Sequence, residues 1–457
     1  MKEENKKPRA KDQKQKSVLI FGVGPLQESI INRAKLMGLY TVGIDPAEDA
    51  ACRNVVDAFE IVGGQDYDGT CAVVEKYGID AIVTAATDKP LVMMARIAEK
   101  YGFPFYSVET AQWSTDKFQM KQRFELGDVP HARGVLLRAS DISHLPFAVS
   151  NQKEPIANGQ QPTASCQKLI ANGQELCLPV IVKPRDNSGS RGVKLCRTKE
   201  ELEQSMAEAL EYSKLDSVLV EEFIEGPEYS IEALHYNAIS HSPLATSGNE
   251  PTANSQQPTV KSVVIQFTEK KTTEFPYNVE LGHIQPANIS EENKQKIREI
   301  ISKIGAALHF ENCPSHTELK INDRGIFVIE TSPRLGGDYI TSTLTPLSTG
   351  VNLEDELLKI ALEEQINPQP EQIQFSGVRF FAFEEGSTIK HVPDVEFVKN
   401  WPNVVDFSFY LREGDQVNRI TSSLNRYGQL ILQAGNRGSI EEAFEKYEKV
   451  IKEQCFG

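Results

Sequence analysis

The 457-residue sequence has no apolar run long enough to span a bilayer and no signal peptide, which argues against a membrane or secreted protein. Its seven cysteines are an odd number, and none of them stands in a C-x-x-C spacing. This usage is typical of free thiols in a reducing compartment. The eight histidines show no zinc-ligand spacing. Together these absences predict a cytoplasmic protein.

The sequence also lacks the common signatures of nucleotide binding and of protein nucleophiles. The P-loop pattern G-x-x-x-x-G-K-[ST] is absent, and there is no Ser-His-Asp or Cys-His signature. The turn Gly22-Val23-Gly24-Pro25 begins like a dinucleotide-binding loop, but the third glycine is missing and Pro25 interrupts it. A net charge of −15 argues against nucleic acid or membrane as a partner, whereas acidic enzymes often meet polyanionic substrates through Mg²⁺.

What is present is a globular composition, with 40% apolar and 25% charged residues and a length that predicts two to four domains. Residues 1–16 are Lys-rich and predict a disordered basic tail. Alternating strands and helices over 17–110 predict a doubly wound α/β domain that ends in a strand at Phe105–Ser107. Ligands bind beyond the carboxyl ends of strands in such sheets, so Gly24 and Asp88 are candidate substrate contacts.

The remaining chain is expected to be α+β, with two insertions. Residues 111–374 mix strands and helices, and a small α+β domain is expected at 375–457. The insertions, at about 139–178 and 241–259, are polar and largely aperiodic, and both carry the sequence A-N-x-Q-Q-P-T. Low-complexity repeats of this kind are typical of surface loops. We therefore expect both insertions to be disordered and functionally silent.

A hairpin is predicted where two β-prone runs, Thr317–Asn322 and Ile326–Glu330, flank the turn signal Asp323-Arg324-Gly325. A three-residue loop closed by Gly325 sets the register, whereas a four-residue loop would put the two glutamates of the hairpin on opposite faces. The expected pairs are Asn322 with Ile326, Ile321 with Phe327, Leu319 with Ile329, and Glu318 with Glu330.

Two carboxylates directly opposite each other repel, so a pair such as Glu318 and Glu330 needs a cation between them or exposure to solvent. Mg²⁺ takes a few carboxylate oxygens and completes its shell with water and phosphate oxygens. The segment that follows contains Arg334, two glycines and Asp338, which are suited to binding an anion against exposed backbone. That neighbourhood favours the metal site over a solvent-exposed sheet face.

A second segment with chemical potential follows the strand that ends near Lys183. The loop Ser188–Gly192 consists of small residues, and Gly189 and Gly192 allow backbone amides to approach a phosphate closely. Such a loop alone is usually a hairpin turn, but a lysine at the strand end favours phosphate binding. An earlier helix, expected to begin at Ser114 or Thr115, carries a further lysine, Lys117.

Taken in order, these segments resemble the ATP-grasp superfamily, which includes biotin carboxylase, carbamoyl phosphate synthetase and the L-amino acid ligases. The resemblance is carried by Lys117, Lys183, the Gly-Ser loop, the segment E-F-I-E-G-P-E at 222–228, and Glu318 with Glu330-x-x-x-Arg334. The stretch L-G-G-D-Y-I that follows Arg334 looks most like the carboxylate–amine ligases that join amino acids. The resemblance implies two α+β subdomains clasping ATP within 111–374.

The resemblance also implies the roles of individual residues. The implied ATP contacts are Lys117, Lys183, Ser188, Gly189, Ser190, Gly192, Glu221, Glu222, Phe223, Ile224 and Glu228. The implied Mg²⁺ ligands are Glu318, Glu330 and Ser332, although the family usually has Asn at the last position. Arg334 and Lys183 are implied to be catalytic. The expected substrate contacts are Gly24, Asp88, His283, Arg334, Gly336, Gly337 and Asp338, of which His283 could equally be structural.

The resemblance implies ATP-dependent ligation of a small-molecule carboxylate and an amine through an acyl phosphate. ATP and Mg²⁺ are the implied cofactors, with two ions expected and Mn²⁺ able to substitute. Two alternatives stay open at this point. One is a bicarbonate-dependent carboxylase, and the other is an ATP-binding protein that has lost catalysis, which Ser332 alone supports. A homodimer through the N-terminal α/β domain is a further expectation by family analogy.

Overall fold

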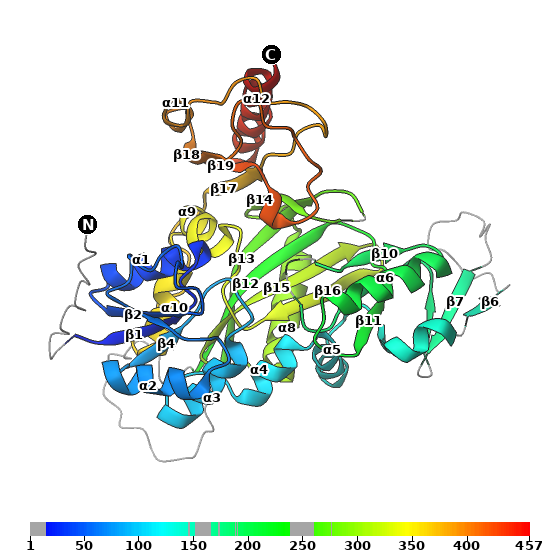
Figure 1. Ribbon diagram of the computed structural model, residues 1–457, viewed down its shortest axis with the longest axis horizontal. Coiled ribbons are helices and arrows are strands. Elements are labelled where there is room, and N and C mark those ends of the chain that lie inside the picture. Colours follow the sequence, from blue (N-terminus) through cyan, green and yellow to red (C-terminus); the bar gives the residue numbers. More distant parts are fainter. Residues whose placement is uncertain are drawn as a thin grey trace.

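The computed structural model describes residues 15–144, 147–150, 166–171, 174–187, 189, 191–237, 260–275 and 277–457. The strands of these residues form four sheets, and the largest lies between the N-terminal unit and a smaller sheet (Figure 1). Across the described ranges, no helix combines the length and the apolar character needed to cross a membrane. The predicted multidomain α/β and α+β fold class is confirmed.

The N-terminal sheet is parallel, with strand order β3-β2-β1-β4, as the continuous apolar runs predict. Its elements are β1 (Ser17–Phe21), η1 (Pro25–Gln27), α1 (Glu28–Leu36), β2 (Tyr40–Asp45), β3 (Ala58–Ile61), α2 (Tyr67–Tyr77), β4 (Ala81–Val83) and α3 (Leu91–Tyr101). The predicted strand at 105–107 is wrong. Ser107 instead caps helix α4 (Val108–Thr115) by accepting from the Thr110 N–H, and the aromatic ring of Tyr106 is buried as part of a loop.

The helix that carries Lys117 begins later than expected. Ser114 and Thr115 are the last residues of α4, and Asp116 is the cap of α5 (Lys117–Leu126). The Asp116 carboxylate accepts from the backbone N–H groups of the second and third helical residues. Aspartate and serine are comparably good helix caps, so residue preference alone did not identify which residue caps this helix. Lys117 consequently stands at the first position of a helix.

The second sheet is antiparallel, with strand order β10-β9-β11-β5. Its elements are β5 (Gly134–Arg138), β9 (Val180–Pro184), β10 (Lys194–Cys196), α6 (Lys199–Glu211) and β11 (Ser217–Glu222). Val182 and Val220 are fully buried and belong to one core with Met206 of α6. The return of the chain from β9 into β10 confirms the strand, loop and strand predicted around Lys183.

The insertion at 139–178 contains ordered structure. It includes η2 (Ala139–His144), and β6 (Phe147–Ser150), β7 (Cys166–Ala171) and β8 (Gln174–Cys177) form an antiparallel sheet. Leu169 and Leu176 are buried in the same core as β9 and β11, so the prediction of disorder is wrong for these strands. The two A-N-x-Q-Q-P-T copies and the whole of 241–259 lie outside the described residues.

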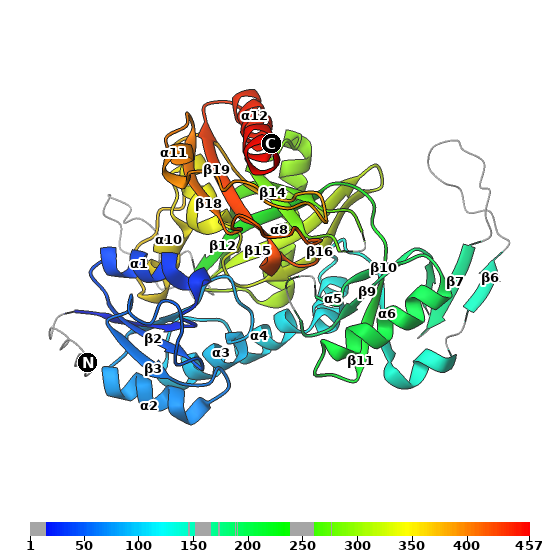
Figure 2. The same ribbon diagram turned by 45° about the horizontal axis from the view of Figure 1, so that its top comes forward.

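The largest sheet has eight strands in the order β16-β15-β12-β13-β14-β17-β19-β18. These are β12 (Glu228–Asn237), β13 (Val260–Thr272), β14 (Glu280–Gln285), β15 (Cys313–Asn322), β16 (Gly325–Ser332), β17 (Phe375–Phe380), β18 (Val404–Phe409) and β19 (Gly428–Ala434). The associated helices are α8 (Glu291–Leu308), η3 (Ile340–Leu344), α9 (Thr345–Thr349), α10 (Leu353–Ala361), α11 (Val395–Lys399), η4 (Ser423–Asn425) and α12 (Arg437–Phe456). Because β14 pairs with β17, the strands after residue 374 extend this sheet, and α12 lies over them (Figure 2).

The β15–β16 hairpin reaches the expected pairing of glutamates by an unexpected route. Asn322 pairs with Gly325, so the turn has two residues, and Gly325 has a φ of 136°. Glu318 nevertheless lies opposite Glu330, because Ile329 is an extra residue that forms a β-bulge. The bulge offsets the one-residue difference at the turn. The other pairs are Leu319–Val328, Lys320–Phe327 and Ile321–Ile326, so the predicted Leu319–Ile329, Ile321–Phe327 and Asn322–Ile326 pairs are wrong.

Candidate active site

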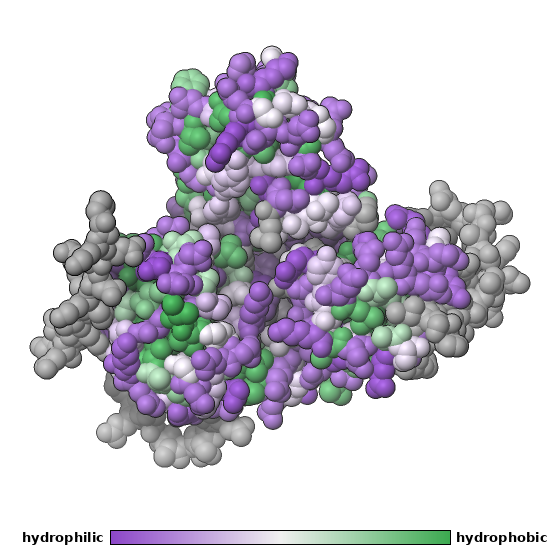
Figure 3. All heavy atoms as spheres, in the orientation of Figure 1, coloured by the Kyte–Doolittle hydropathy of each residue, from purple (hydrophilic) through white to green (hydrophobic). Residues whose placement is uncertain are grey.

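The surface is hollowed where the N-terminal unit, the smaller sheet and the C-terminal strands meet (Figure 3). Glu318 and Glu330 lie on one face of the β15–β16 hairpin. The Lys270 Nζ donates to Glu318 Oε1 at 2.7 Å, and the Lys117 Nζ lies 2.9 Å from Glu330 Oε2. Burial opposes ionisation of Glu318, but Lys270 and His316 together outweigh it and hold the pKa of Glu318 well below its usual value.

These two glutamates fit a divalent cation. Carboxylate oxygens are the ligands that Mg²⁺ prefers, and one or two of them suffice when phosphate oxygens complete the shell. No group of three or more His, Cys, Asp or Glu side chains in the described part of the chain is arranged to hold a metal ion. A metal bound by Glu318 and Glu330 would therefore take further ligands from a nucleotide and water.

Two buried lysines share a single glutamate on the smaller sheet. The Lys183 Nζ lies 2.5 Å from Glu221 Oε2, and the Lys121 Nζ lies 2.7 Å from Glu221 Oε1. Burial opposes ionisation of Glu221, but the two lysines outweigh it and lower the pKa of its carboxyl group. For Lys183, burial is outweighed by Glu221 and Glu330, so its pKa is raised. Lys183 is consequently a fixed positive charge at the end of β9.

Lys117 links the loop between β9 and β10 to the β15–β16 hairpin. Its Nζ donates to the Asn187 carbonyl at 2.9 Å and also pairs with Glu330. Gly189 and Gly192 have φ angles of 69° and 76°, which L side chains rarely adopt. The loop conformation therefore favours glycine at these two positions, while the predicted phosphate contact stays a prediction. Its two predicted serine contacts, Ser188 and Ser190, lie outside the described residues.

In residues 221–228, the segment predicted to bind adenine and ribose, several side chains contact other residues of the protein. The Glu221 carboxylate is occupied by the two lysines, and Glu222 Oε2 accepts from Arg133 at 3.1 Å. The Phe223 ring packs edge-on against Phe275 with centroids 5.5 Å apart, while Ile224 is buried. In the next turn of the chain, Glu228 Oε1 lies 2.7 Å from the Lys270 Nζ.

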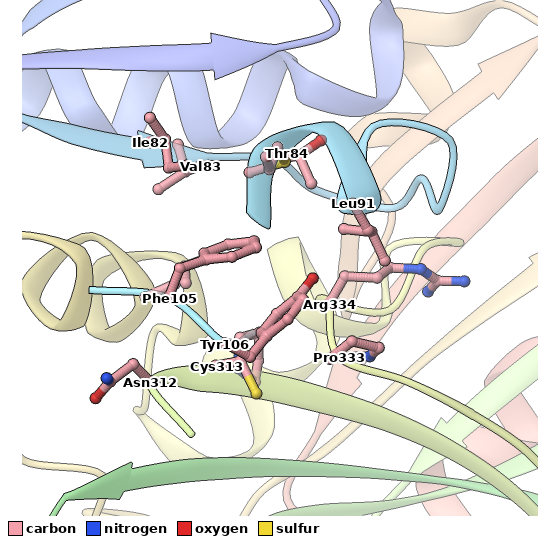
Figure 4. A pocket seen from close by; sticks show the side chains of 13 residues that line it. Ile82, Val83, Thr84, Leu91, Phe105, Tyr106, Asn312, Cys313, Pro333 and Arg334 are labelled. Carbon is pink, nitrogen blue, oxygen red and sulfur yellow. The ribbon is translucent and has the colours of Figure 1, made fainter. Parts of the chain in front are cut away.

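Arg334 is held by the N-terminal unit. Its Nε donates to Asp88 Oδ1 at 2.9 Å, and the Ser332 hydroxyl donates to the same oxygen at 2.5 Å. Burial opposes ionisation of Asp88, but Arg334 outweighs it and lowers the pKa of Asp88. The Ser332 hydroxyl is thus directed to Asp88 in this structure. Figure 4 shows a narrow, mostly apolar cavity beside Arg334, into which the ring of Tyr106 projects.

The other predicted substrate residues come from the same two sides of the site. The backbone N–H of Ala86 donates to the Leu335 carbonyl at 3.3 Å, which joins the loop after β4 to the Arg334–Asp338 segment. The Gly24 N–H donates a hydrogen bond to the side-chain oxygen of Gln27. The side-chain amide of Gln27 donates to the carbonyl of Ala85. Gly24 therefore lies at the same end of the parallel sheet as Asp88, as the strand directions predict.

Asp338 pairs with a residue that the sequence did not single out. Arg426 donates two hydrogen bonds to its carboxylate, at 2.8 Å and 2.6 Å, and His283 Nε2 lies 3.5 Å away. Asp338 and Tyr339 have φ angles of 52° and 65°, a strained conformation for non-glycine residues. Arg426 also stacks on Phe380, with its guanidinium carbon 3.6 Å from the ring centroid. The segment after β16 is therefore fixed by the C-terminal strands.

A buried histidine on β15, which no sequence motif marked, lies beside Glu318. His316 Nδ1 lies 2.6 Å from Glu232 Oε1, and His316 Nε2 lies 3.7 Å from Glu318 Oε1. Burial lowers the pKa of His316, but Glu232 outweighs it and raises the pKa to about 9. A Cβ on Gly336 would lie 2.7 Å from His316 Nδ1 and 3.1 Å from each Glu232 oxygen. The alternation of β15, which puts His316 on the face of Glu318, was an available signal.

Three family models match parts of the chain: "ATP-grasp domain" at residues 257–342, "Carbamoyl-phosphate synthase L chain, ATP binding domain" at 143–236, and "L-amino acid ligase C-terminal domain 2" at 379–453. Protein y4rH of Sinorhizobium fredii is 26% identical over 63% of this chain and 55% of its own length. Alanine–anticapsin ligase of Bacillus amyloliquefaciens is 26% identical over 58% of this chain and 50% of its own length.

The chain thus spans about half the length of the curated relatives it matches. Among solved structures, the L-amino acid ligase from Bacillus licheniformis has a TM-score of 0.72 at 18% identity, covering 96% of this chain and 98% of that chain. A likeness at this identity shows the fold. The matched models, the fold and the arrangement of lysines and glutamates agree: the chain contains ATP-grasp domains, and it is similar in fold to an L-amino acid ligase.

Proposed function

We propose that the protein is an ATP-dependent ligase that joins a carboxylate to an amine through an acyl phosphate. The observation that carries this proposal is the pairing of Glu318 with Glu330 across the bulged hairpin, within reach of Lys117. Two acidic ligands and a nearby ammonium are what a metal-bound triphosphate requires. Lys183 supports the same proposal from the opposite sheet.

Different residues bind the metal and the phosphates in the proposed reaction. Glu318 and Glu330 would hold Mg²⁺, which would supply charge neutralisation on the phosphoryl group. Lys117 and Lys183 bind phosphate oxygens, and the loop with Gly189 and Gly192 presents backbone N–H groups to them. Binding by these groups holds the γ-phosphate against the substrate carboxylate, which attacks it.

Arg334 acts in the second half of the proposed reaction. Its guanidinium is oriented by Asp88 and is buried, with 14% of the side chain exposed. A fixed positive charge at that place stabilises the oxyanion that develops when an amine attacks the acyl phosphate. The products are the amide, ADP and phosphate. No protein nucleophile takes part.

We further propose that the substrates are amino acids. The support is the match of residues 379–453 to the "L-amino acid ligase C-terminal domain 2" model and the similarity to a ligase that joins alanine to anticapsin. Arg426, which pairs with Asp338, lies in this matched part. The predicted domain limits, the homodimer and the cytoplasmic location stay predictions.

The test is phosphate release from ATP and Mg²⁺ against a panel of amino acids, singly and in pairs. Release that needs two amino acids, with the dipeptide found by mass spectrometry, would support the proposal. Release that requires added bicarbonate would instead indicate a carboxylase. ATP binding without release across the panel would contradict amino acid ligation and favour either another substrate class or a protein without catalysis.

A further inference from the structure

Lys270 is a buried cation at the centre of three carboxylates. Its side chain is 3% exposed, and its Nζ lies 2.7 Å from Glu228 Oε1, 2.7 Å from Glu318 Oε1 and 3.5 Å from Glu280 Oε1. The three glutamates stand on three other strands of the largest sheet, β12, β14 and β15. Lys270 itself stands on β13, between β12 and β14. One side chain therefore joins four neighbouring strands.

The three glutamates surround the Lys270 ammonium with carboxylate oxygens at 2.7 Å to 3.5 Å. Burial disfavours the ammonium, but Glu228, Glu318 and Glu280 outweigh it and raise the pKa of Lys270 well above its usual value. Removing the ammonium would leave carboxylates crowded together in a buried place, which is strongly unfavourable.

Two of these glutamates belong to different ends of the proposed nucleotide site. Glu228 is the proposed ribose contact, and Glu318 is a proposed metal ligand. Building on the proposed function, we infer that Lys270 is a positioning residue that joins the ribose end of the site to the metal end. Its ammonium compensates the charge of the three glutamates before the metal arrives with ATP. Lys320, 3.9 Å from Glu228 Oε2, and His316, 3.7 Å from Glu318 Oε1, border the cluster without replacing Lys270.

This role accounts for how the carboxylates are arranged in the described part of the chain. Within the described ranges, no three acidic, histidine or cysteine side chains are arranged to hold one, although three glutamates converge on Lys270. The ammonium occupies the position at which their charges would otherwise attract a divalent ion. Metal binding then depends on the phosphate oxygens of the nucleotide, so metal and ATP enter together.

The decisive variant is Lys270→Met, which keeps a similar length and removes the charge. Its matched control is Lys271→Met, because Lys271 is exposed on the same strand. Mn²⁺ binding without nucleotide is measured by electron paramagnetic resonance. We expect Lys270→Met to bind Mn²⁺ at least about tenfold more tightly than the wild type, since removal of a buried cation leaves uncompensated carboxylates. Lys271→Met should match the wild type.

If Lys270→Met does not fold, the double variant Glu228→Gln/Lys270→Gln removes one charge of each sign and allows the same measurement. Mg·ATP binding is measured in parallel by titration calorimetry. If the wild type binds Mg·ATP and neither Lys270 variant gains Mn²⁺ affinity, the inference is overturned and the proposed function stands. Absence of Mg·ATP binding by the wild type would overturn the proposed function and the inference with it.

Discussion

The two sheets that face the site carry opposite arrangements of buried charge. At the smaller sheet, Lys121 of helix α5 and Lys183 of β9 share one carboxylate, that of Glu221 on β11. On the largest sheet, the carboxylates of Glu228, Glu280 and Glu318 share one ammonium. The first cluster therefore has an excess of positive charge and the second an excess of negative charge.

This difference shows how the chain can accommodate a ligand with charges of both signs. Phosphate oxygens are attracted by the lysine-rich cluster, and a divalent cation is attracted by the glutamate-rich one. Each cluster also contains one group of the opposite sign, Glu221 or Lys270, which keeps the buried charges paired before a ligand binds. Because an unpaired buried charge is costly, these two minority groups should matter most for stability.

The largest effect is expected from Glu330→Gln, which weakens the acidic side of the comparison. The amide keeps the shape but loses the charge that binds Mg²⁺ and pairs with Lys117. We expect ATP-dependent phosphate release to fall by about 10³-fold or more, because charge neutralisation at the transferring phosphoryl group is lost. Asp323→Asn, at the exposed turn of the same hairpin, is the control and should keep its activity. Full activity in Glu330→Gln would contradict the metal assignment.

The next largest effect tests the lysine-rich cluster. Glu221→Gln leaves Lys121 and Lys183 buried next to each other without their carboxylate. We expect the free energy of unfolding, measured with denaturant, to fall by about 3–5 kcal/mol. The neighbouring variant Glu222→Gln loses only the pair with Arg133, whose side chain is 67% exposed, and should lose at most about 1 kcal/mol. Equal losses in the two variants would show that the buried cluster has no special importance.

The sequence contained enough information for the fold class and the pairing of Glu318 with Glu330, but not for every element: the strand expected at 105–107 is absent, and strands β6, β7 and β8 were not expected. It did not contain the β-bulge at Ile329, because a bulge is decided by packing on both faces of the sheet. The correct glutamate pairing therefore came from two compensating differences, a shorter turn and an extra residue in β16. Register predictions from turn length alone are reliable only in regular hairpins.

The partners of the charged residues were largely beyond the reach of sequence analysis. Lys121 was recoverable, since it follows Lys117 by one helical turn and lies on the same face. Lys270 and Arg426 were not, because their contacts join segments that are far apart in the chain. Glu221 was expected near adenine, but its carboxylate is buried between two lysines. Such contacts depend on the order of strands in the sheet, which local patterns do not specify.

A third prediction extends the comparison to Glu354, a buried glutamate that accepts its hydrogen bond from a serine and not from a lysine. Ser29 donates to Glu354 Oε2 at 2.6 Å, and burial raises the pKa of Glu354 from 4.5 to about 7. The folded protein therefore binds more protons than the unfolded chain between pH 4.5 and 7, so stability falls as the pH rises through this window.

The corresponding variant is Glu354→Gln, which stays neutral and still accepts a hydrogen bond from Ser29. Its free energy of unfolding relative to the wild type should be unchanged below pH 4.5 and should rise by about 1–3 kcal/mol by pH 8. Glu364→Gln, on the exposed pair with Lys16, is the control and should show no such rise. A difference that is constant with pH would contradict the assignment.

The smallest effect concerns the histidine that accompanies the glutamate-rich cluster. A Cβ added in Gly336→Ala would lie 2.7 Å from His316 Nδ1, within the pair that His316 makes with Glu232. A Cβ added in Gly337→Ala meets only the Ala86 Cβ at 3.5 Å, an ordinary contact. We expect Gly336→Ala to lose about 1–3 kcal/mol of unfolding free energy and Gly337→Ala less than about 1 kcal/mol.

Denaturant unfolding of these two glycine variants measures the difference, and Mg·ATP binding by each variant measures its consequence. If the displaced imidazolium moves away from Glu318 Oε1, which lies 3.7 Å from His316 Nε2, the metal should bind more tightly in Gly336→Ala, the direction expected for Lys270→Met. Equal stability of the two variants would mean that the His316–Glu232 pair can shift without cost.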